Sequence, residues 1–304
     1  MQPIDHIFMG VALGLCSPER SVDVFVVAIA GSLYPDADLV CGRPGTIGYL
    51  THHRALSHSL LIAPVITAFL AYSTYLIWGN RPFWVLFCWS LAGLIGHLAL
   101  DVLNSFGTAL WLPMNRRKES FDVLYEFDLA VSAILIFSIV FQFFGPTYLG
   151  VSSTVIGLCS GVILCAYIGW RLLSRYFFQR QTFAHINKIS SNIIRQFSVV
   201  PASYWRWKGI IATSDDHYVI RQKDRELSCE KRPRISIPQE FRIPEVQAYE
   251  KYARHLDVTV EGLKLSLQNL VYSPKTYRLD VYFTPDPSSY TFTISLPGIG
   301  YSEY

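Results

Sequence analysis

The stretch Phe83–Leu103, FWVLFCWSLAGLIGHLALDVL, holds a single charged side chain, that of Asp101. A helix needs about 20 mostly apolar residues to cross a bilayer, so the stretch predicts a membrane-spanning helix with a carboxylate near its end. His97 precedes Asp101 by four residues, which places both side chains on one face of that helix. The stretch therefore decides the fold class and also offers the first candidate site.

Three other stretches are long and apolar enough to predict spans: Leu60–Trp78, Leu129–Tyr148 and Val151–Trp170. Two shorter apolar runs, Ile7–Cys16 and Val22–Tyr34, come before them and are separated by a polar turn. Each is too short for an untilted span, so we predict an N-terminal helical hairpin that is tilted or partly inserted. The chain as a whole is 51% hydrophobic and only 16% charged, which lies outside ordinary soluble usage.

Basic residues in short loops predict the orientation, because they favour the cytoplasmic side. Up to Trp170 the chain carries 7 Lys and Arg against 10 Asp and Glu, whereas the remainder carries 19 against 13. The triplet Arg116-Arg117-Lys118 lies between the second and third predicted spans, and Arg171 follows the fourth. We predict a multi-pass protein of the inner (cytoplasmic) membrane whose C-terminal half is cytoplasmic.

The pattern changes after the last predicted span. A basic amphipathic helix is expected from Arg171 to about Phe197, and period-two alternation follows from Val199 onward, with a helix near Glu245 to Leu256. The predicted fold class is an α-helical integral membrane domain followed by a small soluble α+β domain. Its predicted parts are a membrane domain at residues 1–173, a linker helix at 174–198 and a β-rich domain at 199–304.

Histidines and aspartates gather near the ends of the apolar runs. Imidazole and carboxylate are ligands for divalent metals, and a mixture of both without thiolate spacing favours a catalytic over a structural metal. With the predicted orientation, one membrane face collects every candidate. We predict these metal ligands: His6, Asp36, Asp38, His53, His58, His97 and Asp101. Zinc is the first choice of metal, with manganese and magnesium as alternatives.

Each of these residues also has a simpler interpretation. Asp36 and Asp38 follow Pro35, where such carboxylates commonly end a helix. Asp101 and His97 could be a helix-end carboxylate in water and a histidine packed between helices. Burying a charge near a bilayer is costly, however, and a metal would compensate that of Asp101.

Two further residues are predicted to be catalytic. Arg54 could bind a phosphate through two hydrogen bonds, and it could equally be a basic anchor at the interface. Asp128 borders the uncharged run of the third predicted span. Of the neighbours His52 and His53, we expect His53 to point into the site.

Four motifs resemble those of the YdjM-like family in their order and spacing. The members of that family are described as LexA-regulated, metal-dependent hydrolases of the inner membrane. The motifs are HIFMG at 6–10, YPDAD at 34–38, HRALSHS at 53–59 and GHLALD at 96–101. The likeness continues to Asp128 and covers about the first half of the chain. Departures are Ala55, where glycine is frequent, and Ser105, where threonine is common. The resemblance implies a metal-dependent hydrolase with the seven ligands above as its polar signature. A looser similarity to zinc-dependent phospholipase C enzymes is the source of the phosphoester expectation.

The predicted function is metal-assisted hydrolysis of a phosphoester, lipid or lipid-linked, at the cytoplasmic membrane face. Membrane lipid is the expected partner and the oligomeric state is left open. The rival is a non-enzymatic membrane protein, either a metal or ion carrier or a lipid-binding scaffold. A carrier should place polar groups near mid-span, whereas here they gather at one end. Nucleic acid is not expected as a partner, since the positive charge of the C-terminal half is mild and no motif accompanies it.

Overall fold

A computed structural model gives the architecture of the chain, which divides into two compact units. The first contains Met1–Asp38 and Arg54–Ser174, and the second contains Leu39–His53 and Arg175–Tyr304. The structure describes residues 3–18, 20–41, 54–189, 194–214, 216–223, 226–233, 235–237, 239, 242, 244, 246–247, 249, 256–261, 264–269, 278–283, 290–296 and 299–303.

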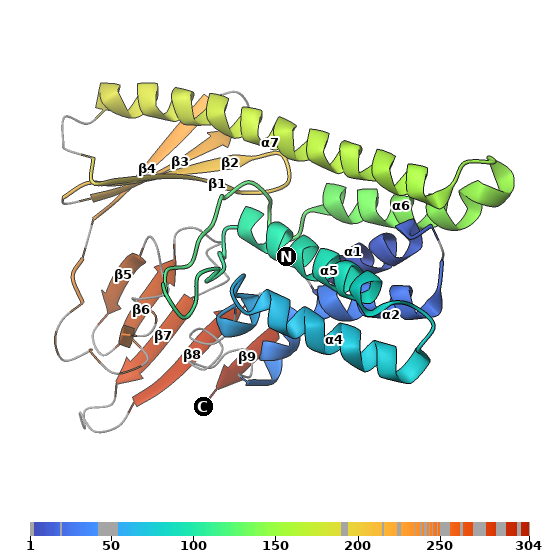
Figure 1. Ribbon diagram of the computed structural model, residues 1–304. Helices are drawn as coiled ribbons and strands as arrows, with labels where there is room; N and C mark the ends of the chain where they lie inside the picture. The colour runs from blue at the N-terminus through green and yellow to red at the C-terminus, as the bar shows by residue number, and fades with distance from the viewer. Residues whose placement is uncertain are drawn as a thin grey trace. The chain divides into compact units, whose positions relative to one another are not determined.

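The first unit is built of helices (Figure 1), and its described residues between α2 and α4 include the short 3-10 helices η1 and η2. Their bounds are α1 Pro3–Cys16, α2 Val22–Leu33, η1 Tyr34–Cys41, η2 Leu56–His58, α4 Ala63–Trp78, α5 Phe83–Leu103, α6 Leu129–Tyr148 and the first part of α7 Ser153–Ile189. The predicted N-terminal hairpin is therefore the pair α1 and α2. Helices α5 and α6 have the predicted bounds, because a breaker precedes each run: Pro82 before α5 and the capping Asp128 before α6.

Within the described residues, three helices are long and apolar enough to cross a membrane: α5, α6 and the segment Ser153–Ile186 of α7. Their outward faces carry large apolar side chains such as Phe137, Phe141 and Ile163, as expected for surfaces that contact lipid. The fold is thus a helical membrane region followed by antiparallel sheets.

The predicted span at Leu60–Trp78 is not confirmed. Helix α4 has only 16 residues, or about 24 Å of helix against a hydrocarbon core of about 30 Å. The backbone amide of Leu60 donates to the carbonyl of Leu110 instead of joining a helix (3.0 Å). Pro64 stands in the first turn of α4, where its missing N–H costs nothing, and Gly79 ends the helix with a left-handed φ of 62°.

The linker helix predicted at 174–198 is continuous with the last predicted span. Helix α7 runs without interruption from Ser153 to Ile189, because the sequence holds no glycine or proline between Gly169 and Pro201. Gln196 and Phe197, expected at the end of a helix, are already in strand β1.

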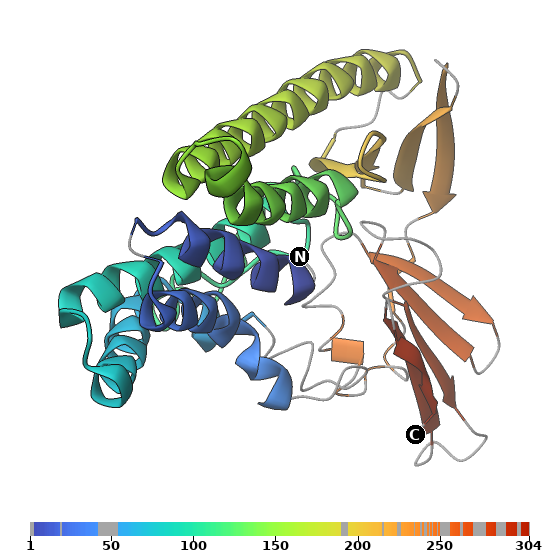
Figure 2. The ribbon, with the colours of Figure 1, turned by 90° about the vertical axis from the view of Figure 1, so that its right-hand side faces the viewer.

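Close helix packing sets the positions of the polar side chains in the first unit (Figure 2). Helix α5 packs against α2 and α4, and α1 packs against α2, α5 and α6. At the α2–α5 crossing a side chain on Gly31 would clash with the carbonyl of Ser90, and one on Gly93 with that of Ala28. Glycine at both positions lets the two backbones approach, as at other membrane-helix interfaces.

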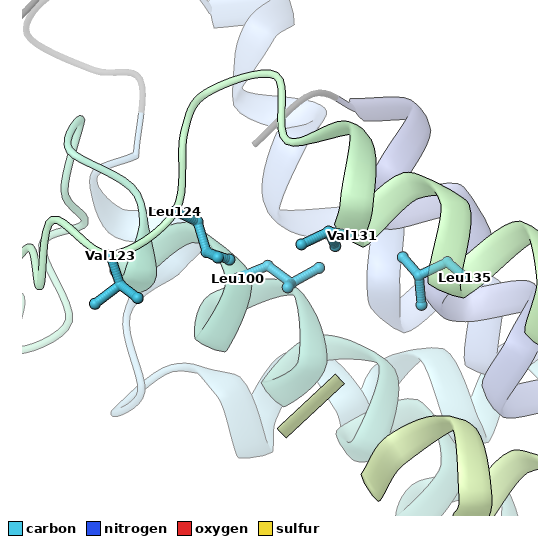
Figure 3. Close-up of a cluster of buried hydrophobic side chains, with 5 residues drawn as sticks. All are labelled: Leu100, Val123, Leu124, Val131 and Leu135. Atoms are coloured by element: carbon cyan, nitrogen blue, oxygen red, sulfur yellow. The ribbon is translucent and has the colours of Figure 1, made fainter. Parts of the chain in front are cut away.

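A buried apolar cluster holds the last turn of α5 in place (Figure 3). Leu100 of α5 packs with Val131 and Leu135 of α6 and with Val123 and Leu124 of the loop before it. Because Leu100 precedes Asp101, this packing also fixes where the carboxylate of Asp101 lies.

The described residues of the second unit form two antiparallel sheets, each with its strands in sequence order. The first has β1 Gln196–Pro201, β2 Trp207–Ala212, β3 Asp216–Lys223 and β4 Glu226–Pro233. The second has β5 Leu256–Glu261, β6 Lys264–Asn269, β7 Arg278–Phe283, β8 Tyr290–Leu296 and β9 Ile299–Glu303. Ile186 of α7 packs on the first sheet against Ile211 and Ile220. The β-rich prediction is confirmed, while most of the helix expected near Glu245 lies outside the described residues and Leu256 begins β5.

Candidate metal centre

Four of the predicted ligands meet in the first unit. Asp36 lies on η1, His58 on η2, and His97 and Asp101 on α5. One ligand atom from each lies within 4.8 Å of those of the other three. The side chains of His58, His97 and Asp101 are 0% exposed, so the cluster is shielded from water.

The distances between ligand atoms in this cluster match those expected between the ligands of one metal ion. Nε2 of His58 lies 3.1 Å from Nε2 of His97, and both nitrogens lie near Oδ2 of Asp101, at 3.3 and 3.4 Å. Four ligands placed tetrahedrally at about 2.0–2.1 Å from a zinc ion are about 3.3–3.4 Å from one another. Oδ1 of Asp36 is somewhat farther out, 3.8 Å from His97 and 4.0 Å from His58. The atoms from His58, His97 and Asp101 thus have the mutual spacing of three corners of a tetrahedron. A small movement of Asp36 would bring its Oδ1 atom to the fourth corner.

Hydrogen bonds behind the two imidazoles orient their free nitrogens toward this point. Nδ1 of His97 donates to the backbone carbonyl of Ser32 (2.7 Å), which can only accept, so the lone pair is on Nε2. Nδ1 of His58 donates to the hydroxyl oxygen of Ser57 (2.9 Å) and lies 3.4 Å from Oδ2 of Asp38, to which the same hydroxyl donates at 2.8 Å. Carbonyl and carboxylate partners of this kind support metal-binding histidines in general.

With both Nδ1 atoms protonated, the two Nε2 lone pairs point at each other across 3.1 Å. That contact is repulsive unless a proton or a metal ion lies between them. Burial lowers the pKa of His58, but hydrogen bonds to Asp101 and Asp38 outweigh it and raise the pKa above its ordinary value. Because metal and proton compete for the same lone pair, the carboxylates that favour the proton also favour a cation.

Two neighbouring groups are buried without the hydrogen bonds that buried polar atoms normally have. The ring of His6 stacks on that of His97, with centroids 3.6 Å apart, and neither ring nitrogen makes a hydrogen bond within the described part of the chain. Nε2 of His6 lies 3.4 Å from Oδ1 of Asp101. Oδ2 of Asp36 is likewise buried and unbonded among the described residues. Such exceptions are rare in native proteins and fit a site that binds a cation.

Asp38 was expected to be a ligand, yet the structure places it behind His58, outside the group of four. Its Oδ2 atom accepts hydrogen bonds from Ser57 and from the backbone amide of Arg54 (2.9 Å). The backbone of η1 turns Asp36 inward and Asp38 toward the η2 segment. Asp38 therefore contacts His58 from behind and is not part of the group of four.

Arg54 lies at the edge of the cluster, only 5% exposed, with Nη2 at 2.9 Å from Oδ1 of Asp101. Its backbone has a left-handed φ of 59°, which is uncommon for a residue with a side chain and is found mainly at functional sites. The guanidinium carbon lies 4.7 Å from the ring centre of Phe106, and Nζ of Lys118 lies 4.8 Å from the same point. Burial and the nearby charge of Arg54 lower the pKa of Lys118 to about 7.

Asp128 is not brought into the cluster. Its carboxylate caps helix α6 by accepting from the amides of Ala130 and Val131, and it also accepts from the hydroxyl of Tyr167 at 2.8 and 2.9 Å. The prediction of a catalytic role rested on its place at the start of an uncharged run, and a helix N-cap explains that place fully.

All four residues of this group were among the ligands predicted from the sequence, and the i, i+4 pairing of His97 and Asp101 is confirmed. His53 and His52 lie outside the described residues. Sequence reasoning missed Ser57, Phe106 and Lys118 as parts of the site. Ser57 stands inside a quoted motif and Lys118 in a basic triplet, but neither position signals which side chain points inward.

The fold and this cluster together define a helical membrane protein with a His/Asp centre suited to a metal ion. The chain belongs to the YdjM inner membrane protein family, whose model matches residues 1–178. It is also 24% identical over 231 residues to a Bacillus subtilis (strain 168) protein described as "Uncharacterized protein YfhP", with 72% of this chain and 67% of that protein covered. No solved structure matches the chain.

Proposed function

We propose that this protein is a membrane-bound, metal-dependent hydrolase that cleaves a phosphoester at the cytoplasmic face of the inner membrane. The observation that carries the proposal is the spacing of three ligand atoms from His58, His97 and Asp101, at 3.1–3.4 Å from one another in a fully buried site. The cluster lies beside the end of α5, an apolar helix long enough to cross a membrane. A lipid or lipid-linked phosphoester suits a site at that depth.

The residues present would hold a divalent ion through the neutral imidazoles of His58 and His97 and the carboxylate of Asp101, with Asp36 farther out. Two histidines and one carboxylate, with the fourth position open, are a donor set found in catalytic zinc sites. When bound, the ion would supply Lewis acidity and the activation of water near neutral pH. Ser32 and Asp38 hold the two histidines in the tautomer that metal binding requires. Arg54, anchored on Asp101, is placed to bind a substrate oxygen next to the ion.

Metal content and hydrolysis measured together test this proposal. Full-length protein purified in detergent should contain a stoichiometric divalent metal and cleave chromogenic or lipid phosphoesters. His97→Ala should lose both. Asp23→Asn is a matched control, because Asp23 is also a buried carboxylate but lies at the opposite end of α2 from η1. Its metal content and hydrolysis should stay unchanged.

Two results would contradict the proposal. A folded wild-type protein without metal above background would remove the centre itself. Stoichiometric metal without hydrolysis of any phosphoester would leave the centre but favour the carrier alternative, which a flux assay in vesicles would then examine.

A further inference from the structure

The basic triplet that follows α5 is divided by the structure. Arg117 is highly exposed, with 78% of its side chain accessible, and it faces Glu119 at 3.8 Å. Lys118 is turned inward instead, with its ammonium group over the ring of Phe106. The sequence alone predicts a plain basic loop here. In the structure one residue of that loop, Lys118, is directed to the candidate metal centre.

Phe106 brings Lys118 together with a second cation. The guanidinium of Arg54 and the ammonium of Lys118 each lie within 5 Å of the centre of this one ring. The charges of Asp38 and Asp101 favour the protonated form of Lys118 and raise its pKa, whereas the charge of Arg54 lowers it. Three carboxylates therefore face two cations around the site: Asp36, Asp38 and Asp101 against Arg54 and Lys118.

A divalent ion at the cluster would reverse this charge balance. It would offset two of the three carboxylates and leave the two cations in excess by at most one charge, which is reached when Lys118, with its pKa of about 7, is protonated. Such a site attracts an anion, and an anion that reaches it sits next to a metal ligand, since Arg54 also contacts Asp101 at 2.9 Å.

The backbone around the two cations is fixed independently of any ligand. The amide of Ala109 donates to the carbonyl of Arg54 (3.1 Å), and Thr108 exchanges two hydrogen bonds with Glu119 at 2.9 Å each. Glu119 follows Lys118 directly. These hydrogen bonds therefore connect the backbone at both cationic residues to the same segment, Thr108 and Ala109. A preorganised pair of this kind loses little conformational entropy on binding.

We propose that Arg54 and Lys118 form an anion subsite beside the metal centre, which binds the phosphate group of the substrate. The guanidinium supplies paired, directional donors, and the ammonium supplies a compact charge near the same ring of Phe106. The identification of the anion as the substrate's phosphate rests on the proposed function. The phosphate could belong to a lipid headgroup or to a soluble ester, and both share this chemistry.

Titration of the full-length, metal-loaded protein with inorganic phosphate tests the subsite. Lys118→Met removes the charge and keeps most of the side-chain length, and it should weaken phosphate binding about 10-fold or more. Lys118→Arg should retain most of the affinity. Arg117→Met, a change of the adjacent exposed cation, should leave it unaltered. Metal content is measured on every variant and should stay at the wild-type level.

Competition distinguishes the two sources of phosphate. Short-chain phosphatidic acid that displaces inorganic phosphate at lower concentration than glycerol phosphate identifies a lipid headgroup as ligand, and the reverse order identifies a soluble ester. Equal phosphate affinity for wild type, Lys118→Met and Arg117→Met would overturn the subsite, while metal and hydrolysis would still support the proposed function. Conversely, Lys118-dependent phosphate binding in a protein without hydrolysis would keep the subsite and refute the hydrolase.

Discussion

Two buried polar clusters lie in the first unit, and they differ in the balance of donors and acceptors. Around Asp128 every contact pairs a donor with an acceptor: the amides of Ala130 and Val131 and the hydroxyl of Tyr167 all donate to one carboxylate. Around Asp101, Oδ1 accepts from Arg54 at 2.9 Å, whereas Oδ2 faces His58 and His97, whose Nε2 atoms carry lone pairs because their Nδ1 atoms donate on the other side.

The comparison teaches how a structural cluster differs from a binding centre when both are fully buried. A carboxylate that receives N–H and O–H donors is satisfied by the protein alone. Acceptors that converge at 3.1–3.4 Å, as they do around Oδ2 of Asp101, need a proton or a metal ion between them. Burial and charge alone do not separate the two clusters, because Asp101 and Asp128 are equally inaccessible.

Removal of a central ligand should have the largest effect. Asp101→Ala deletes the carboxylate that lies near both His58 and His97, so metal affinity should fall by more than about 100-fold, beyond what changes behind a ligand typically cause. Competition against a chelator of known affinity, followed by elemental analysis, measures it. Asp128→Ala should keep full metal content. If the folded Asp101→Ala protein bound metal like wild type, the cluster would be ordinary helix packing.

The residue that orients His58 should matter less. Asp38→Asn keeps the size of the side chain but removes the charge that faces Nδ1 of His58 and accepts from Ser57. Metal affinity should fall by about 10- to 100-fold without loss of the fold. The same chelator competition checks this, with the thermal unfolding midpoint of the metal-free protein as the control for folding. A loss as large as that of Asp101→Ala would place Asp38 among the ligands instead.

Such contrasts also show what could be predicted from the sequence. Local pattern was enough for α5 and α6, whose bounds equal the predicted runs, and for the shared face of His97 and Asp101. Both depend only on chain-local physics, namely an unbroken apolar run and the helical period. The convergence of η1, η2 and α5 was predicted from the common membrane face of their residues.

Other features depend on contacts that local pattern does not contain. Asp36 and Asp38 are chemically alike and two apart, and only the 3-10 backbone of η1 decides which one faces His97. Lys118 and Arg117 differ in the same way, since the Thr108–Glu119 bridge sets which of them reaches Phe106. The length of α4 depended on the long-range bond between Leu60 and Leu110.

Disruption of the satisfied cluster should affect stability and leave the metal centre intact. Asp128→Ala removes the N-cap of α6 and leaves the hydroxyl of Tyr167 without its acceptor. The free energy of unfolding should fall by about 1–3 kcal/mol. Thermal or denaturant unfolding in detergent measures it, and metal affinity measured in parallel should match that of wild type. Loss of metal with an intact fold would show that the two clusters are coupled.

The smallest effect is expected for Tyr167→Phe, which deletes one hydroxyl and retains the ring. The carboxylate of Asp128 keeps the amides of Ala130 and Val131 as donors, so one hydrogen bond is lost and no buried charge is stranded. A single hydrogen bond to a charged group contributes about 1.5–3 kcal/mol at most, and the half-buried position of Tyr167 lets water replace part of it, so a loss of about 1 kcal/mol is expected. The unfolding free energy of the metal-free protein gives the value directly, and the gain in stability on adding metal should be the same as for wild type. A smaller gain would mean that the hydroxyl of Tyr167 supports the metal centre through Asp128, and the distinction between a satisfied cluster and a binding centre would then not hold in this protein.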